Sequence, residues 1–203
     1  LAKMASGTDG NIISYDASGN PVAVATGSAG QVLTSAGAGA PPTFQAAAGG
    51  GKVLQVVSTA TTNQFSTSSN TLTDCTPMTV DITPSATTSK VLVLVNMTVG
   101  GSADNRTGIA LQRGSTDIFQ GADSSNRQGV TSGTQNAEDN SVYNVAFQFL
   151  DSPSSTSSLT YHIQVSAQAA GSETMFLNRN GTNADQQYTK HTASSITVME
   201  IGA

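Results

Sequence analysis

The chain has 203 residues, a net charge of −5 and a single cysteine, Cys75, so no disulfide can form within it. Only 10% of its residues are charged, and its eight Lys and Arg side chains never cluster, which argues against a nucleic-acid partner. No apolar run approaches the roughly 20 residues of a membrane helix, and the first residues lack the hydrophobic region of a signal peptide. We therefore expect no insertion into a membrane, and we expect Cys75 to be a small buried side chain.

The first predicted elements belong to a repeat of twenty residues, with residues 9–24 matching residues 29–44. Each copy predicts a strand, a glycine-rich turn and a second strand, at 11–15 and 21–25 and again at 31–35 and 41–45. Glycine permits turn conformations that other residues resist, and proline is confined to strand starts or edges. The glycines and prolines of the two copies coincide: Gly10 with Gly30, Gly19 with Gly39, and Pro21 with Pro41.

The repeats predict a stalk that partner chains complete. A two-stranded hairpin is marginal in water, and a short segment rarely stabilises itself without a metal, disulfides or other chains. We expect residues 1–51 to form an extended attachment segment in which three copies wind around one axis and bury Ile12, Val24, Val32, Leu33 and Phe44. A flexible linker rich in Gly, Ala and Ser is the alternative. The stretch at 46–52 predicts the joint between stalk and head.

The remaining residues, 52–203, predict a head made of a β-sandwich. Many short apolar runs are separated by turns rich in Ser, Gly, Asn and Asp, and no run has a helical period. We expect eight to ten strands, at 52–59, 78–84, 90–100, 107–114, 116–121, 141–151, 158–168, 174–181 and 194–201. Residues 121–140 have almost no apolar side chain and are expected to form a loop at one end of the sandwich or along its outside.

Alternation along the strands predicts which face of each strand is buried. The strand at 91–95 is apolar on both faces, so we expect one face to join the core and the other, with Leu92 and Leu94, to approach a symmetry mate. In two other strands one face alone is apolar, and we expect these residues in the core: Tyr143, Val145, Phe147 and Phe149, and Tyr161, Ile163 and Val165.

The sequence offers little that points to catalysis. The two histidines, His162 and His191, are expected on the surface, and no nucleophile elbow of the G-x-S-x-G type is present. No His and Cys spacing suits zinc, and Glu138 with Asp139 lacks the pattern of a calcium loop. We predict no enzymatic activity, no cofactor and no metal.

Two polar clusters are candidate surface contacts for sugar hydroxyls, because planar amides, arginine and an aromatic ring suit such ligands. The alternative is that they are ordinary polar loops or contacts between subunits, with Arg179 paired to a carboxylate of a neighbouring subunit. The candidate residues are Asp104, Asn105 and Arg106 in the first cluster, and Asn178, Arg179, Asn180, Asp185 and Tyr188 in the second.

The repeat motif "GQVLTSAGAGAPPTFQ" resembles the repeats of tail-fibre and other virion proteins of tailed phages. The head is similar to the β-sandwich modules that end such fibres, in "TLTDCTPMTVDITPSATTSKVLVLV", "LQRGSTDIFQG", "FQFLDSPSSTSSLTYHIQV" and "HTASSITVMEI". The resemblance implies a homotrimer on the particle surface with an interwoven stalk and a jelly-roll head like that of tumour necrosis factor. It implies no catalytic residues and supplies no binding residues.

We expect a short trimeric fibre that docks on other virion proteins through its N-terminal segment and exposes its head to a host surface receptor or glycan. Two repeats make a stalk far shorter than that of long tail fibres, so a fibre on the head of the particle or a capsid-decorating protein without a receptor role stays open. A monomeric carbohydrate-binding module is a further alternative, although the chain has no Trp and only four Tyr. The last is an enzyme such as a glycan esterase or depolymerase.

Overall fold

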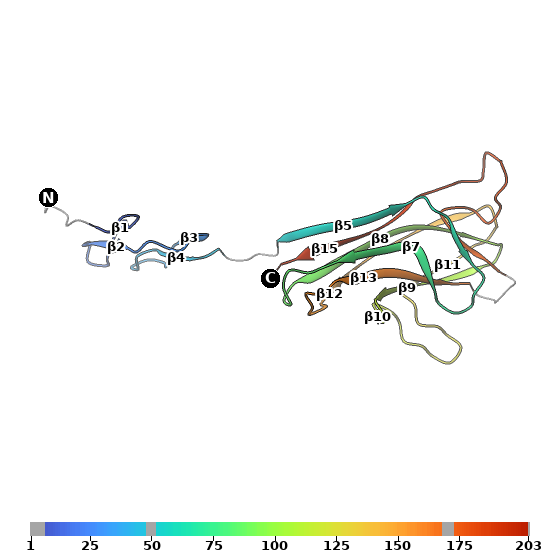
Figure 1. Cartoon of the computed structure of the whole chain (residues 1–203), viewed down its shortest axis with the longest axis horizontal. Coiled ribbons are helices and arrows are strands. Elements are labelled where there is room, and N and C mark those ends of the chain that lie inside the picture. Colours follow the sequence, from blue (N-terminus) through green and yellow to red (C-terminus); the bar gives the residue numbers. More distant parts are fainter. Residues whose placement is uncertain (1–6, 48–51, 168–172, 203) are drawn as a thin grey trace. The chain divides into compact units, whose positions relative to one another are not determined.

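The computed structural model describes residues 7–47, 52–167 and 173–202. Every regular secondary-structure element assigned to these residues is a β-strand, so the all-β class is confirmed. Among the same residues, no helix has the length and apolar character needed to span a membrane. The chain divides into two compact units, Leu1–Gly50 and Gly51–Ala203, called here the N-terminal unit and the head (Figure 1). The joint expected at 46–52 lies mostly outside the described residues.

The N-terminal unit consists of two hairpins, one in each repeat. Strand β1 (Ile12–Tyr15) pairs antiparallel with β2 (Pro21–Val24), and β3 (Gln31–Thr34) pairs antiparallel with β4 (Thr43–Ala46). The turns require glycine, because Gly19 has a φ of 80° and Gly39 a φ of 84°, in the left-handed region that side chains resist. The predicted strand, turn and strand of each repeat are therefore confirmed.

Few side chains of the N-terminal unit are buried. Val24 is 7% exposed and is the one buried apolar residue among those described in this unit. Gly27 lies against Phe44 so closely that an added Cβ would stand 2.6 Å from the Phe44 Cβ and Cγ atoms. The large apolar side chains that remain exposed are Ile12, Ile13, Tyr15, Val32 and Leu33.

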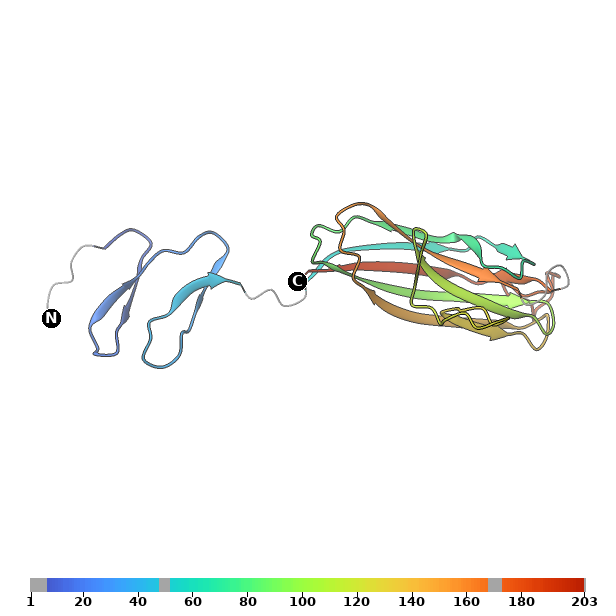
Figure 2. The ribbon, with the colours of Figure 1, turned by 90° about the horizontal axis from the view of Figure 1, so that it is seen from below.

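The head contains two sheets that run along its length (Figure 2). In the first sheet, β8 (Lys90–Gly101) pairs on one side with β12 (Val142–Asp151) and on the other with β15 (Ser194–Ile201) and then β14 (Met175–Leu177). Strand β5 (Val53–Thr61) pairs with β15, and β6 (Phe65–Thr67) pairs with β14. Among the described residues, the first sheet therefore contains six strands but is four strands wide, because β5 beside β15 and β6 beside β14 lie at different ends of β8.

The second sheet is also four strands wide. Strand β13 (Leu159–Ser166) lies between β7 (Thr73–Ile82) and β9 (Arg106–Arg113), and the other edge of β9 pairs with β10 (Thr116–Ile118) and β11 (Ser132–Gln135). All these pairings are antiparallel, and a bulge interrupts the pairing of β13 with β7 between His162 and Gln164. Together the sheets form a β-sandwich, as predicted.

The core lies between the two sheets, where alternate residues of their strands meet. Val91, Val93 and Val95 are buried, whereas Leu92 and Leu94 face outward and are half-buried, so the prediction of one core face for this strand is confirmed. The predicted core residues of β12 and β13 also point inward: Val145, Tyr161, Ile163 and Val165 are buried, and Tyr143, Phe147 and Phe149 pack against the core.

Two buried carboxylates tie the strands of the head to one another. Glu200 on β15 accepts hydrogen bonds from Ser85 N at 2.7 Å, from the Ser85 and Ser89 hydroxyls at 2.6 and 2.7 Å, and from Gln55 Nε2 at 2.6 Å. Asp151 on β12 accepts from Arg113 Nη1 at 2.5 Å and from the Tyr161 hydroxyl at 2.7 Å. These bonds satisfy groups that would be costly to bury without partners.

The structure corrects three expectations about the strands. The segment 121–140 is not a loop throughout, because β11 pairs along β9 from Ser132 to Gln135. Strand β7 begins at Thr73 rather than at Met78, and β6 was not predicted. All three errors have a local cause: β11 and β6 are short and mostly polar, and Pro77 lies inside β7, where it indicates a strand boundary.

Candidate functional site

The outer surface of the first sheet carries no charge over most of its width. Three rows of side chains cross it from β5 through β15 and β8 to β12, and we call these twelve residues the uncharged face. The strand registers give the rows as Val56, Met199, Leu92 and Leu150; Ser58, Thr197, Leu94 and Gln148; and Ala60, Ser195, Asn96 and Ala146. Lys90 stands at the border of this face, beside Ile201.

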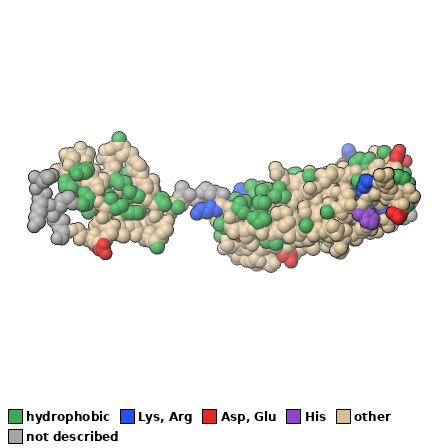
Figure 3. Space-filling model, turned by 90° about the horizontal axis from the view of Figure 1, so that it is seen from above, with side chains coloured by type: hydrophobic (Ala, Val, Ile, Leu, Met, Phe, Trp, Pro, Cys, Tyr) green, Lys and Arg blue, Asp and Glu red, His purple; other side chains and the backbone are tan. Residues whose placement is uncertain are grey.

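The first row of the uncharged face is wholly apolar, with its two end residues exposed and Met199 and Leu92 half-buried. Val56 and Leu150 are 55% and 48% exposed. Next to this row, Val53 and Leu54 at the start of β5 are exposed as well, and Figure 3 shows a group of hydrophobic side chains at the end of the head where β5 begins. The residues that β15, β8 and β12 contribute to the next two rows line a groove of about 430 Å³. Leu92 and Leu94, predicted as interface residues, thus belong to a surface of twelve residues.

Three of the predicted surface-contact residues are buried, which corrects their expected place. Asn105 and Asn178 are fully buried, and Asn180 is 1% exposed. The Asn178 amide donates to the carbonyl oxygens of Thr61 and Asn63 at 3.1 and 2.9 Å and accepts from the Ser194 hydroxyl at 2.6 Å. Such amides satisfy the polar groups of neighbouring loops and cannot reach a ligand in solvent.

The other predicted contact residues do not form one site. Arg179 stacks over the ring of Phe176 at 3.6 Å and donates to the carbonyl oxygens of Asn180 and Gly181, so the head itself holds its guanidinium. Burial lowers the pKa of Arg179. Asp104, Arg106, Asp185 and Tyr188 have exposed side chains.

Val24 and Phe44, predicted to lie in a trimer interface, pack within the N-terminal unit. Both line a cavity of about 250 Å³ between the two repeats. Val24 is already buried within the unit, which corrects the expectation that it is free to contact a partner chain. Ile12, Val32 and Leu33 are exposed and available for such a contact.

The histidines and the cysteine have separate surroundings. His162, expected on the surface, is mostly buried, and its Nε2 lies 3.3 Å from Asp74 Oδ1. His191 is exposed, with Nε2 3.2 Å from Asn183 Oδ1. Burial raises the pKa of the Cys75 thiol to about 12, so the thiol is neutral at physiological pH. Within the described ranges, no group of three or more His, Cys, Asp or Glu side chains is placed to hold a metal ion.

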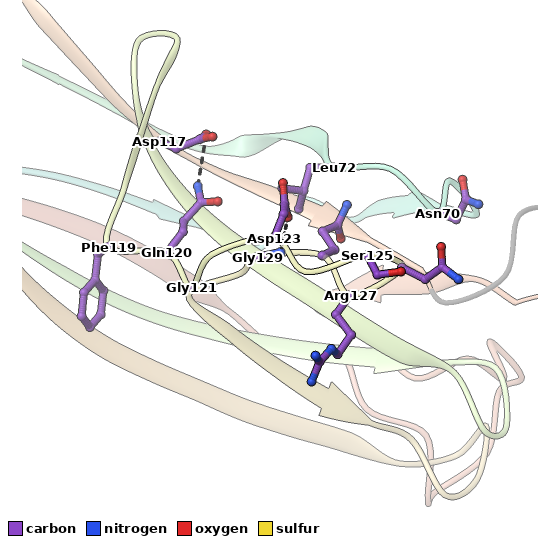
Figure 4. Close-up of a pocket in the computed structure, with 12 residues that line it drawn as sticks. Asn70, Leu72, Asp117, Phe119, Gln120, Gly121, Asp123, Ser125, Arg127 and Gly129 are labelled. Carbon is purple, nitrogen blue, oxygen red and sulfur yellow. Dashed lines mark hydrogen bonds between the residues drawn. The ribbon is translucent and has the colours of Figure 1, made fainter.

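A second hollow lies on the other side of the sandwich, over the second sheet. The segment 117–129, which begins within β10, lines a cavity of about 590 Å³ together with Asn70 and Leu72 (Figure 4). Gln128 in this segment accepts a hydrogen bond at 2.7 Å from the Ser166 hydroxyl on the outer face of β13. Because the two sheets pack by their inner faces, this cavity and the uncharged face lie on opposite sides of the head.

Neither the scan against protein-family models nor the search of curated proteins found a match. Among solved structures, the chain is similar to one described as the structure of infectious bursal disease virus Gx strain, with a TM-score of 0.39 and 8% identity over 90% of this chain and 46% of that chain. It is also similar to the crystal structure of the infectious bursal disease virus VP2 subviral particle, with a TM-score of 0.34 and 10% identity over 84% and 44%.

This chain thus spans less than half of the length of either viral chain. With TM-scores below 0.5, the two matches carry no argument for a shared function.

Proposed function

We propose that this protein is a structural protein of a virus particle and that it assembles as a homotrimer through its N-terminal unit and the uncharged face of its head. It forms a short fibre on the particle surface, docked on other virion proteins through the N-terminal unit, with the head directed outward. The observation that carries the proposal is the uncharged face, a wide and partly apolar sheet surface that no other described part of the head covers.

An exposed apolar surface of this kind is unusual for a protein that works alone. Monomeric proteins rarely expose large contiguous apolar patches, and such patches mark places where another molecule binds. The uncharged face has a wholly apolar row across four strands, from Val56 to Leu150, in a chain whose net charge is −5. Further copies of the same chain suit this face, since uncharged faces gathered around a threefold axis meet without burying an unpaired charge.

The N-terminal unit supports the same partner. Its two hairpins expose Ile12, Ile13, Val32 and Leu33, and a pair of two-stranded hairpins has too little buried surface to be stable alone. Neither a disulfide nor a described metal group compensates for this. Association with sister chains removes these apolar side chains from water, at about 25 cal/mol for each Å² buried.

Chain connectivity joins the two apolar surfaces. Strand β5 begins at Val53, three residues after the N-terminal unit ends at Gly50. Val53 and Leu54 lie next to the apolar first row of the uncharged face, so copies held together by their N-terminal units bring this edge of each head near the others. The close coupling of two association surfaces raises the effective concentration of the second once the first has formed.

The test is the mass of the full chain in solution by light scattering. We expect a measured mass of about three times the chain mass of 20.5 kDa at micromolar concentration. Leu94→Asp places a charge in the middle of the uncharged face and is expected to shift the mass toward that of one chain, because burying an unpaired carboxylate is costly. Thr116→Asp, at an exposed position on β10, is the matched control and is expected to keep the wild-type mass.

A wild-type mass of one chain contradicts the trimer, and an unchanged mass for Leu94→Asp contradicts the assignment of the uncharged face.

The proposed location of the protein on a virus particle is tested by a separate experiment. Imaging of intact particles is expected to trace three N-terminal units at a virion surface, and their absence from purified particles contradicts the virion role.

A further inference from the structure

We infer that the cavity between the segment 117–129 and Asn70 is a binding site for a neutral saccharide. This inference rests on the proposed function in one respect: the cavity lies opposite the uncharged face and stays open to solvent when that face is covered. It replaces the two clusters predicted from sequence, whose amides at Asn105, Asn178 and Asn180 are buried.

Hydrogen bonds hold two carboxylates of the cavity in place while leaving part of each free. Asp123 Oδ1 accepts from Gly129 N at 2.5 Å, and Asp117 Oδ1 accepts from Gln112 Nε2 at 2.5 Å and Gln120 Nε2 at 3.3 Å. Their Oδ2 atoms accept no hydrogen bond from any residue that the structure describes. A fixed carboxylate with a free oxygen is a ready acceptor for a sugar hydroxyl, because little conformational entropy is lost on binding.

Amide groups add donors and acceptors from a second segment of the chain. The side chains of Asn70 and Asn126 make no hydrogen bond within the described residues, and both line the cavity. In the view of Figure 4, Asp117 and Asn70 stand at opposite sides of the cavity, with Asp123 and Leu72 between them. Each amide offers both a donor and an acceptor, which matches hydroxyl groups that also do both.

Charge and polarity decide the class of ligand. The cavity has two carboxylates, Asp117 and Asp123, against one guanidinium, Arg127, which disfavours a phosphate, sulfate or other anion. Leu72 supplies apolar surface beside these polar groups. A pyranose combines hydroxyl groups with apolar C–H faces, and a cavity of about 590 Å³ is within the usual range for small-molecule sites.

The segment that lines the cavity is anchored to the sandwich. Phe119 has a φ of 54°, and its ring stacks on Phe149 of β12 with centroids 4.9 Å apart. The Ser166 hydroxyl donates a hydrogen bond to the Gln128 side chain, and the Thr131 hydroxyl donates one to the Phe119 carbonyl oxygen at 2.9 Å. Sites held by such secondary contacts keep their geometry, which lowers the entropic cost of binding.

The experiment uses the full chain on an array of oligosaccharides. The probes are neutral oligosaccharides of hexose, 6-deoxyhexose and N-acetylhexosamine, each beside a sulfated or sialylated counterpart, and titration calorimetry then measures affinity for the bound probes. We expect neutral probes to bind more tightly than their anionic counterparts. Asn126→Ala and Asn70→Ala are each expected to weaken binding by about tenfold, as expected for the loss of hydrogen bonds.

Asn183→Ala, at an exposed asparagine that lines a separate cavity with His191, is the matched control and is expected to keep wild-type affinity. Three results each overturn the inference: no neutral probe binds, anionic probes bind more tightly, or neither Asn126→Ala nor Asn70→Ala weakens binding.

The mass of the chain is measured on the same samples and separates the two proposals. A trimer that binds no sugar overturns the saccharide site and leaves the assembly standing. A monomer whose sugar binding depends on Asn126 overturns the assembly and keeps the saccharide site.

Discussion

The head and the N-terminal unit are built from the same kind of antiparallel strand pair, yet they bury their apolar side chains to different degrees. In the head, two sheets meet and enclose a cluster of 19 buried hydrophobic residues. In the described part of the N-terminal unit, Val24 alone is buried among the apolar residues, and five large apolar side chains remain exposed. A hairpin pattern therefore fixes local pairing in both units, but only a second layer supplies the burial that stabilises it.

The sharpest test of this comparison places the same change in each unit. Ile163→Ala removes a fully buried side chain from the head and is expected to lower its free energy of unfolding by about 4 kcal/mol, because the lost burial leaves a cavity. Ile13→Ala removes a side chain that is 51% exposed and is expected to leave the head within about 0.5 kcal/mol of wild type. Urea unfolding followed by circular dichroism measures both, and equal losses contradict the comparison.

The carboxylates of the two units give the next largest contrast. Burial by itself raises the pKa of the Glu200 carboxyl, but hydrogen bonds from Ser85, Gln55 and Ser89 outweigh it and lower the pKa from 4.5 to about 2. Because the folded pKa is below the unfolded one, the stabilisation is fully present above pH 4.5 and is lost as the pH falls toward 2. Glu200→Gln is expected to cost about 2 kcal/mol at pH 7 and to flatten the pH dependence in this range.

Asp16 in the N-terminal unit is the control for this prediction. Backbone and side-chain hydrogen bonds from Asn20 lower the pKa of its carboxyl, but the residue is only half-buried, in a hairpin turn, so water screens its interactions. Thermal unfolding measured from pH 7 to pH 2 is expected to show a much smaller effect for Asp16→Asn than for Glu200→Gln. A pH profile for Glu200→Gln that follows the wild type disproves the role of this carboxylate.

The smallest expected effect is confined to the N-terminal unit. Gly27→Ala would place a Cβ 2.6 Å from Phe44, and the resulting repacking is expected to cost about 1 kcal/mol in this unit and nothing in the head. Amide hydrogen exchange in β3 and β4 measures the local loss of protection. Gly7→Ala is the matched control, since an added Cβ there meets nothing within 4 Å. Increased exchange in the head as well would show that the two units are not independent.

Alternation and turn residues predicted most of the fold because both are local properties of the chain. The inward faces of β12 and β13 follow from side chains two residues apart, and the two hairpins follow from Gly19 and Gly39. Strand β11 could not be predicted, because its four residues, Ser132 to Gln135, contain no apolar side chain and depend on the edge of β9 for pairing. Polar strands of this kind are recognised only from their partners.

The candidate sites were harder to predict because their residues come from distant parts of the sequence. Leu92 and Leu94 indicated an outward apolar surface, but the other strands of the uncharged face meet only in the folded sheet. The signal in the sequence was an absence of charge at alternate positions of four strands. The prediction that Asn178 lies on the surface is wrong. Its φ of 62° is in the left-handed region, which asparagine tolerates, and asparagine side chains often form hydrogen bonds with nearby backbone groups.

Each twenty-residue repeat of the N-terminal unit closes its own two-stranded sheet, and neither sheet borrows a strand from elsewhere in the described chain. Duplication or deletion of one whole block in the gene would consequently add or remove a complete hairpin without altering any strand pairing in the rest of the protein. Evolution can thus change the number of hairpins that precede the head in the sequence in discrete steps, while the globular part is preserved unchanged.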